Sequence, residues 1–156
     1  MRQHGNKRNF LSKGVNIMKT AIRYYTKGGN TKKLADAISK AVGVEAKTTS
    51  EPLTEDVDIL FLGSSVYAFG VDKSVEQFIN GINVKVGKVV NFSTAAMLKS
   101  TYKQVAKLLA KKNIPLAQEE FACRGSFGAV HKGKPDVDDC KAAAEFAKKI
   151  ILRGEK

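Results

Sequence analysis

The chain has little of what disulfide-stapled, metal-binding or membrane-spanning proteins depend on. Its 156 residues include only two cysteines, Cys123 and Cys140, and two histidines, His4 and His131. Two cysteines are too few for a disulfide framework and lack metal-ligand spacing, so we expect reduced thiols and no metal site. No run approaches the roughly 20 apolar residues that cross a bilayer, and no apolar segment of a secretory signal follows the basic N-terminus. These absences predict a cytoplasmic protein without membrane association.

Acidic residues are also scarce, with 15 Asp and Glu against 27 Lys and Arg, which leaves a net charge of +12. Residues 1–17 carry no acid and show no periodicity, so we interpret them as a basic, disordered extension. Residues 18–156 then form a single domain. Spaced lysines on helices are typical of solvated faces, although such a surface attracts anionic partners. Nucleic-acid binding has only this electrostatic support, because no helix-turn-helix, zinc-finger or aromatic strand signature is present.

From residue 18 onward, apolar β-branched runs alternate with amphipathic stretches. This alternation predicts an α/β fold, a three-layer sandwich in which helices cover both faces of a doubly wound, five-stranded parallel sheet. The exception is the link 49–56, where Pro52 leaves room for only a short turn or a single helical turn. The expected strands span about 19–25, 44–48, 57–63, 86–92 and 116–123, and the expected helices about 30–42, 72–80, 99–112 and 137–152.

The segment Thr26-Lys27-Gly28-Gly29-Asn30-Thr31 leaves the first strand and opens the first helix. Its glycines allow successive N–H groups to converge, and a helix N-terminus adds partial positive charge, which together suit a phosphate. The simpler alternative is a tight turn in which Asn30 caps the helix.

Two further loops are expected at the same edge of the sheet, because the carboxyl ends of parallel strands meet there. The third strand is followed by 63–70, which combines small residues with Tyr67 and Phe69, two rings that can stack on a flat ligand. The fourth strand is followed by 91–98, which is again small and rich in hydroxyls. The three loops together predict a cradle for a phosphorylated, planar cofactor.

These loops make the chain resemble the flavodoxin family from Met18 to about Ile150. The family's phosphate loop is close to Thr/Ser-x-Thr-Gly-Asn-Thr, and this chain supplies Thr26, Gly29, Asn30 and Thr31 at the matching places. It departs at Gly28, where the family usually has threonine. The resemblance implies strand order 2-1-3-4-5 and FMN as cofactor.

The resemblance also implies which residues contact FMN. The third loop lacks a clear stacking aromatic residue, since Tyr102 belongs to the following helix, and Met97 is more simply explained as packing inward. Gly125 is expected to let the last loop approach the dimethylbenzene side of the ring. The phosphate is assigned to Thr26, Lys27, Gly28, Gly29, Asn30 and Thr31, and the ring to Val66, Tyr67, Ala68, Phe69, Gly70, Thr94, Ala95 and Gly125.

The function implied by the resemblance is electron transfer by an FMN-binding carrier with a redox partner protein. The basic charge of this chain predicts an acidic surface on that partner. Electron-carrier flavodoxins are typically acidic around the flavin, whereas this chain is basic. A positive field near the flavin stabilises its reduced anion, so we expect a higher last reduction potential than in an acidic flavodoxin.

Two other functions stay open. One is an FMN-dependent NAD(P)H:quinone or porphyrinogen-type oxidoreductase. For this activity no residue is an obvious catalytic acid or base, and His131 is more simply an exposed bystander. The other is a non-redox module that binds anions or nucleic acid. A receiver-like signalling domain is set aside, because it needs an acid where this chain has Gly63-Ser64-Ser65.

Overall fold

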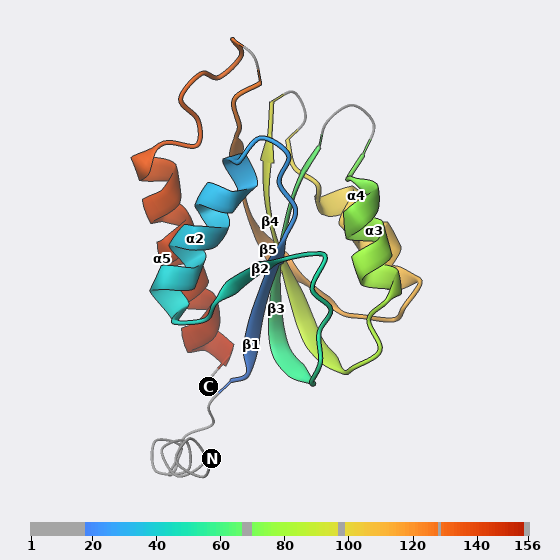
Figure 1. Ribbon diagram of the computed structural model, residues 1–156. Helices are drawn as coiled ribbons and strands as arrows, with labels where there is room; N and C mark the ends of the chain where they lie inside the picture. Colours follow the sequence, from blue (N-terminus) through green and yellow to red (C-terminus); the bar gives the residue numbers. More distant parts are fainter. Residues whose placement is uncertain (1–17, 67–69, 97–98, 128, 155–156) are drawn as a thin grey trace.

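The computed structural model describes residues 18–66, 70–96, 99–127 and 129–154. Five parallel strands form one sheet in the order β2-β1-β3-β4-β5, which is the predicted order. The first strand in sequence order, β1, therefore lies inside the sheet between β2 and β3 (Figure 1). The strands are β1 (Thr20–Tyr24), β2 (Ala46–Thr48), β3 (Val57–Val66), β4 (Val86–Ala95) and β5 (Leu116–Arg124).

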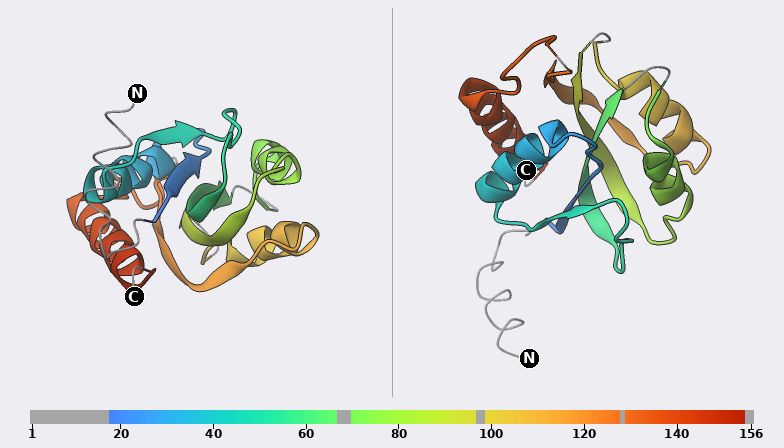
Figure 2. Two further views of the ribbon diagram at one scale, coloured as in Figure 1. Left: turned by 90° about the horizontal axis from the view of Figure 1, so that it is seen from below. Right: turned by 45° about the horizontal axis from the view of Figure 1, so that its top comes forward.

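Four helices among the described residues cover the two faces of the sheet. The first pair, α2 (Asn30–Val42) and α5 (Val137–Gly154), packs on one face. The second pair, α3 (Lys73–Asn80) and α4 (Tyr102–Ala110), packs on the other face (Figure 2). Two apolar cores result, one on each side of the sheet, as the alternation of helix and strand predicts.

The two central strands run three residues further than predicted. We expected them to end near residues 63 and 92, but β3 continues to Val66 and β4 to Ala95. The added residues include three serines and one threonine, which resemble a loop in composition. They are nevertheless buried and paired, from Ser64 opposite Ser93 to Val66 opposite Ala95. Small hydroxyl side chains fit this crowded interior where their oxygen atoms find hydrogen-bond partners.

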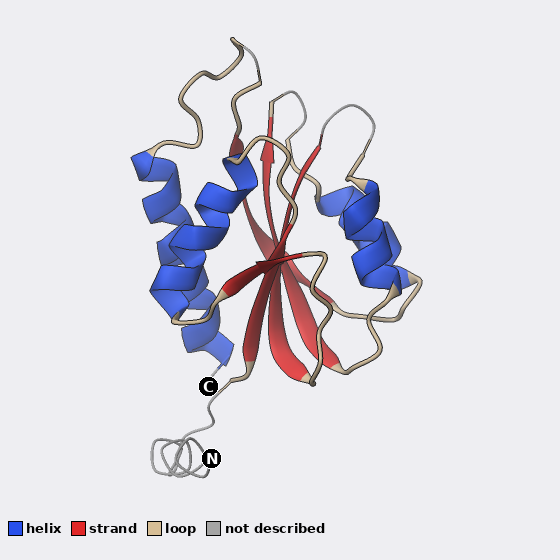
Figure 3. Ribbon diagram, in the orientation of Figure 1, coloured by secondary structure: helices blue, strands red, loops and turns tan. Residues whose placement is uncertain are grey.

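The link between β2 and β3 contains no helix, in agreement with the prediction of a short turn (Figure 3). Leu53 from this link enters the core beside α3 and is buried. Arg23 on β1 is only 7% exposed, and its guanidinium donates to the carbonyl oxygens of Glu51 at 2.7 Å and Pro52 at 3.2 Å. Burial lowers the pKa of Arg23 from its usual value. A buried cation and one leucine thus hold the link where a crossover helix would otherwise pack.

Candidate functional site

A hollow of about 300 Å³ lies at the carboxyl edge of the sheet, where the three predicted loops were expected to meet. It is bounded by the β1–α2 loop, by the ends of β3 and β4, and by the segment that follows β5. The residues that line it are Thr26, Lys27, Gly28, Asn30, Ser65, Val66, Thr94, Ala95, Ala96, Gly125, Ser126 and Phe127.

The β1–α2 loop turns sharply into the helix. Gly29 is the N-cap of α2 and has φ of 96°, a left-handed conformation that favours glycine. Its N–H donates to the hydroxyl of Thr26 at 2.9 Å, which closes the turn. The first N–H groups of a helix have no acceptor within it, and they carry the positive end of the helix dipole. The start of α2 is therefore suited to an anion.

Asn30 does not cap the helix, which corrects the simpler interpretation of this loop. It is the first helical residue, and its side-chain N–H donates to the carbonyl oxygen of Ser126 at 2.9 Å. This bond joins the first loop to the last loop across 96 residues of sequence. Ser126 and Phe127 were not predicted as site residues. The only local signal for them was their position directly after Gly125.

Thr31 and Thr94 are buried and hydrogen-bonded to each other, with 3.0 Å between their hydroxyl oxygens. Gly125 lies against this pair. A Cβ atom built on Gly125 would be 3.0 Å from Asn30 Nδ2 and 3.0 Å from Thr94 Cβ. The last loop therefore approaches the first loop and β4 as closely as a glycine allows.

The structure brings most of the predicted site residues together. The hollow is lined by Thr26, Lys27, Gly28, Asn30, Val66, Thr94, Ala95 and Gly125. Three other predicted residues do not line it: Gly29 shapes the turn, Thr31 faces Thr94, and Gly70 precedes Val71, the bridge partner of Val66. The predicted contacts at Tyr67, Ala68 and Phe69 fall outside the described residues, as does Met97, which was expected to pack inward.

Val66, Thr94 and Ala95 were predicted to lie in loops, but they are the last residues of strands. Thr94 is paired with Ser65 of β3 on one side and with Cys123 of β5 on the other. Beyond β3, Val66 pairs with Val71 in an isolated antiparallel bridge, so the loop that leaves β3 returns to its own start.

A buried polar network joins the carboxyl ends of β3 and β4 to β5 and to the start of α4. The hydroxyl of Thr101 accepts from Ser64 Oγ at 3.0 Å and from Asn91 Nδ2 at 3.1 Å. Asn91 also donates to Glu120 on β5, whose second oxygen accepts from Ser100 at 3.1 Å. These bonds fix the start of α4 and the carboxyl ends of β3 and β4 relative to one another.

The charge around the hollow is positive. Lys27 is the one charged side chain among its described lining residues, and no carboxylate lines that part of it. Arg124 Nη1 donates to the carbonyl oxygen of Ala96 at 3.1 Å, and His131 Nε2 lies 3.1 Å from the same oxygen. His131 is exposed, as predicted, but it contacts the rim of the hollow through Ala96.

The loop between β5 and α5 ends in a reciprocal cap. The N–H of Asp136 donates to the carboxylate of Asp139, and the N–H of Asp139 donates to that of Asp136, both at 2.9 Å. Lys134 bridges the two carboxylates. Its hydrogen bond lowers the pKa of Asp136 to about 2. The Asp136 carboxylate is therefore ionised at neutral pH, and Lys134 pairs with it.

Both cysteines are free thiols. Burial raises the pKa of Cys123 to about 12, and the negative charge of Asp139 adds to the rise. A thiol with such a pKa stays protonated at neutral pH and is a poor nucleophile. Over the described ranges, no group of three His, Cys, Asp or Glu side chains is placed to hold a metal ion. The helices in those ranges are also too short or too polar to cross a membrane.

Comparison with known proteins assigns the family. A family model described as a flavodoxin domain matches residues 21–134, which is most of the chain. The chain belongs to the flavodoxin family. An uncharacterised protein of Methanocaldococcus jannaschii is 32% identical over 136 residues, which cover 78% of this chain and 90% of that protein.

Solved flavodoxin structures share the fold. A flavodoxin from the domain Archaea superimposes with a TM-score of 0.71 at 15% identity, covering 87% of this chain and 98% of that chain. Oxidised flavodoxin 2 from Bacillus cereus gives a TM-score of 0.66 at 20% identity, covering 88% and 99%. Rubredoxin oxygen:oxidoreductase from Desulfovibrio gigas gives 0.66 at 14% identity, with 86% of this chain matching 35% of that chain. The flavodoxin fold thus occurs both as a whole protein and as part of larger oxidoreductases.

The described part of the hollow fits the phosphate end of a flavin nucleotide. It combines the N-terminus of α2, the cation Lys27 and the hydroxyl of Thr26. Gly125 has no side chain at the junction of the first and last loops, where a Cβ atom would crowd Asn30 and Thr94. On β3 and β4, the described lining residues end at Val66 and Ala96, and the adjoining segments 67–69 and 97–98 lie outside the described residues.

Proposed function

We propose that this flavodoxin-family chain binds FMN at the carboxyl edge of its sheet and acts in electron transfer. The observation that carries the proposal is the hollow in which the β1–α2 loop, the ends of β3 and β4 and the Gly125 loop converge. Bound FMN supplies the redox chemistry, and the protein supplies binding, orientation and electrostatics. The start of α2 and Lys27 would hold the phosphate, and the ends of β3 and β4 would flank the rest of the cofactor.

The basic surroundings bear on the potential and on the partner. A site with a lysine and no described carboxylate in its lining favours a reduced, anionic flavin. We therefore propose a last reduction potential above that of acidic flavodoxins. The net charge of +12 supports a redox partner with an acidic surface, because opposite charges speed encounter at low salt.

Absorption spectroscopy of the protein mixed with FMN and then desalted tests the proposal. We expect retained flavin bands near about 375 and 450 nm, contributed by the cofactor itself. Riboflavin, which lacks the phosphate, should be held far less tightly than FMN if the α2 N-terminus contributes as argued. Reductive titration then gives the potential, and turnover with NAD(P)H alone would favour the oxidoreductase alternative. FMN that washes away completely would refute the proposal.

Replacing Gly28 with threonine is expected to tighten FMN binding. No atom lies within 4 Å of a Cβ built on Gly28, and its φ lies outside the left-handed region. The new hydroxyl would restore the threonine that the family's phosphate loop usually has. One added hydrogen bond to phosphate contributes on the order of 1 kcal/mol, or about fivefold in affinity.

The matched control is Gly28→Ala, which restricts the backbone similarly but adds no hydroxyl. Titration of FMN fluorescence measures Kd for the three proteins. If alanine and threonine change Kd equally, the hydroxyl does not reach the phosphate and this assignment of the loop is wrong.

A further inference from the structure

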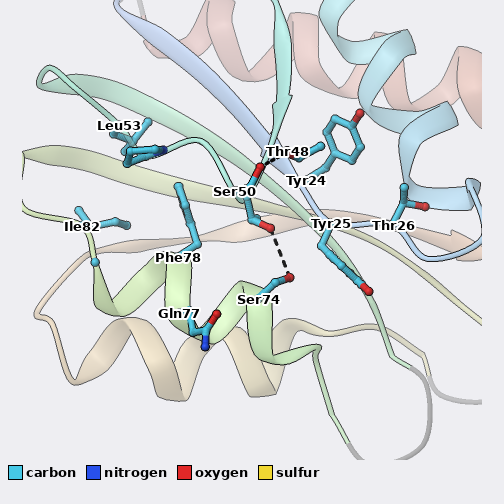
Figure 4. Close-up of a pocket in the computed structure, with 13 residues that line it drawn as sticks. Tyr24, Tyr25, Thr26, Thr48, Ser50, Leu53, Ser74, Gln77, Phe78 and Ile82 are labelled. Carbon is cyan, nitrogen blue, oxygen red and sulfur yellow. Dashed lines mark hydrogen bonds between the residues drawn. The ribbon is translucent and has the colours of Figure 1, made fainter.

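The helix-free link between β2 and β3 leaves a second, larger hollow on the α3 side of the sheet. Its volume is about 630 Å³, roughly twice that of the hollow at the phosphate loop and within the usual range for small-molecule sites. It lies between the ends of β1 and β2, the link itself and α3 (Figure 4). Its lining residues are Tyr24, Tyr25, Thr26, Thr48, Thr49, Ser50, Pro52, Leu53, Ser74, Gln77, Phe78, Gly81 and Ile82.

The described residues that line this hollow are uncharged, although the whole chain is strongly basic. Leu53, Phe78 and Ile82 form an apolar end, and hydroxyls from Tyr25 and Ser74 lie toward the other end (Figure 4). An ion placed here would lose hydration without gaining an opposite charge, which is unfavourable. A neutral molecule with a flat or cyclic apolar body and one or two oxygen atoms matches both ends.

The nearest buried cation is directed away from this hollow. Arg23 donates to the carbonyl oxygens of Glu51 and Pro52 and is not among the lining residues. Its hydrogen bonds instead hold the link in place as one wall. The opposite wall is α3, and the two walls meet in a long hydrogen bond of 3.3 Å from Thr49 Oγ1 to Ser74 Oγ. A bond of this length is weak and exchanges readily for one to a ligand oxygen.

We propose that this second hollow binds a neutral, ring-containing small molecule that carries hydroxyl or carbonyl groups. Leu53, Phe78 and Ile82 contact the ring, and the hydroxyls of Thr49 and Ser74 exchange hydrogen bonds with its oxygen atoms. The ligand lies beside the end of β1, because Thr26 lines both hollows. The inference does not rest on FMN binding, since the two sets of lining residues share only Thr26.

Two naphthalene probes of similar shape test the charge preference. The neutral probe is 2-naphthol and the anionic probe is 2-naphthoate, each titrated into the ¹⁵N-labelled full chain and followed by amide chemical shifts. We expect 2-naphthol to bind at least tenfold more tightly, with the largest shifts at Ser74, Gln77 and Phe78. The net positive charge by itself would favour the anion, so tighter binding of 2-naphthol would be due to the uncharged lining of the hollow.

Saturating FMN separates the two hollows. We expect the affinity for 2-naphthol to be unchanged within about twofold whether or not FMN is present, as for independent sites. Displacement of 2-naphthol by FMN would overturn the proposal, because it would place the probe at the phosphate-loop hollow.

Ser74→Leu is the test variant, because it places a bulky apolar side chain in the polar part of the hollow, while the backbone N–H of residue 74 can still donate to the Asp72 carboxylate. Its control is Lys73→Leu, the same new side chain at an exposed neighbouring position that does not line the hollow. We expect S74L to weaken 2-naphthol binding at least tenfold and K73L to leave it unchanged, with both folded by circular dichroism. Equal binding by S74L, tighter binding of 2-naphthoate, or no binding of 2-naphthol at millimolar concentration would each overturn the proposal.

Discussion

Replacing Gly63 with alanine is expected to lower the free energy of unfolding by about 3 kcal/mol, the upper range for overpacking a core. Gly63 lies in the middle of β3, opposite Tyr24 of β1 and Phe92 of β4. A Cβ atom built there would overlap the ring of Phe92, which is fully buried. Both backbones are held in strands that are paired on both sides, and the Phe92 ring is packed in the core, so the overlap can be relieved only by displacing packed neighbours.

Urea unfolding of single and double variants at Gly63 and Phe92 measures the cost of this steric overlap. We expect Phe92→Leu to reduce stability by itself, since it removes buried ring atoms, by about 1–2 kcal/mol. The Gly63→Ala/Phe92→Leu double variant should lose less free energy of unfolding than the sum of the two single losses, because leucine leaves room for the new methyl group. Gly28→Ala is the control, with no atom within 4 Å of its Cβ and an expected change below about 0.5 kcal/mol. Strictly additive effects would show that the overlap is not the cause.

Replacing Gly125 with valine is expected to weaken FMN binding by about 30-fold, or ~2 kcal/mol. Its Cβ would lie 3.0 Å from Asn30 Nδ2 and from Thr94 Cβ, so the β-branched side chain must push both residues away. Moving Asn30 breaks its bond to Ser126 and displaces the start of α2. The helix N-terminus would then no longer face the phosphate at its best distance.

Fluorescence titration with FMN, together with thermal unfolding of the FMN-free protein, separates binding from folding. Gly125 follows the last residue of β5, outside the sheet, so we expect a smaller change in stability than for Gly63→Ala. Gly28 lines the same hollow, but a Cβ atom there has no neighbour within 4 Å, so Gly28→Ala should retain FMN binding. Unchanged affinity in Gly125→Val would mean that the last loop takes no part in holding the cofactor.

The sequence by itself was sufficient for the alternation of strands and helices, and therefore for the layers. Apolar runs and amphipathic periods are local patterns, and the chirality of parallel crossovers leaves few ways to arrange them. The helix-free link was also predictable, because Pro52 in an eight-residue connection prevents a full helix. The turn at residues 26–31 was predictable for a similar reason, since its glycines and the helix that follows lie next to one another in the chain.

Only the tertiary structure decided where the strands end and which loops meet. Ser64, Ser93 and Thr94 have loop-like composition, yet they extend the strands because their hydroxyls have buried partners. Ser64 donates to the Thr101 hydroxyl, Ser93 accepts from the Thr101 N–H, and Thr94 shares a hydrogen bond with Thr31. Such bonds join residues far apart in sequence, and no local pattern encodes them. The same holds for Asn30, whose local signal is that of a cap but whose partner is Ser126. Local periodicity thus determines the elements, whereas long-range packing determines the lining of both hollows.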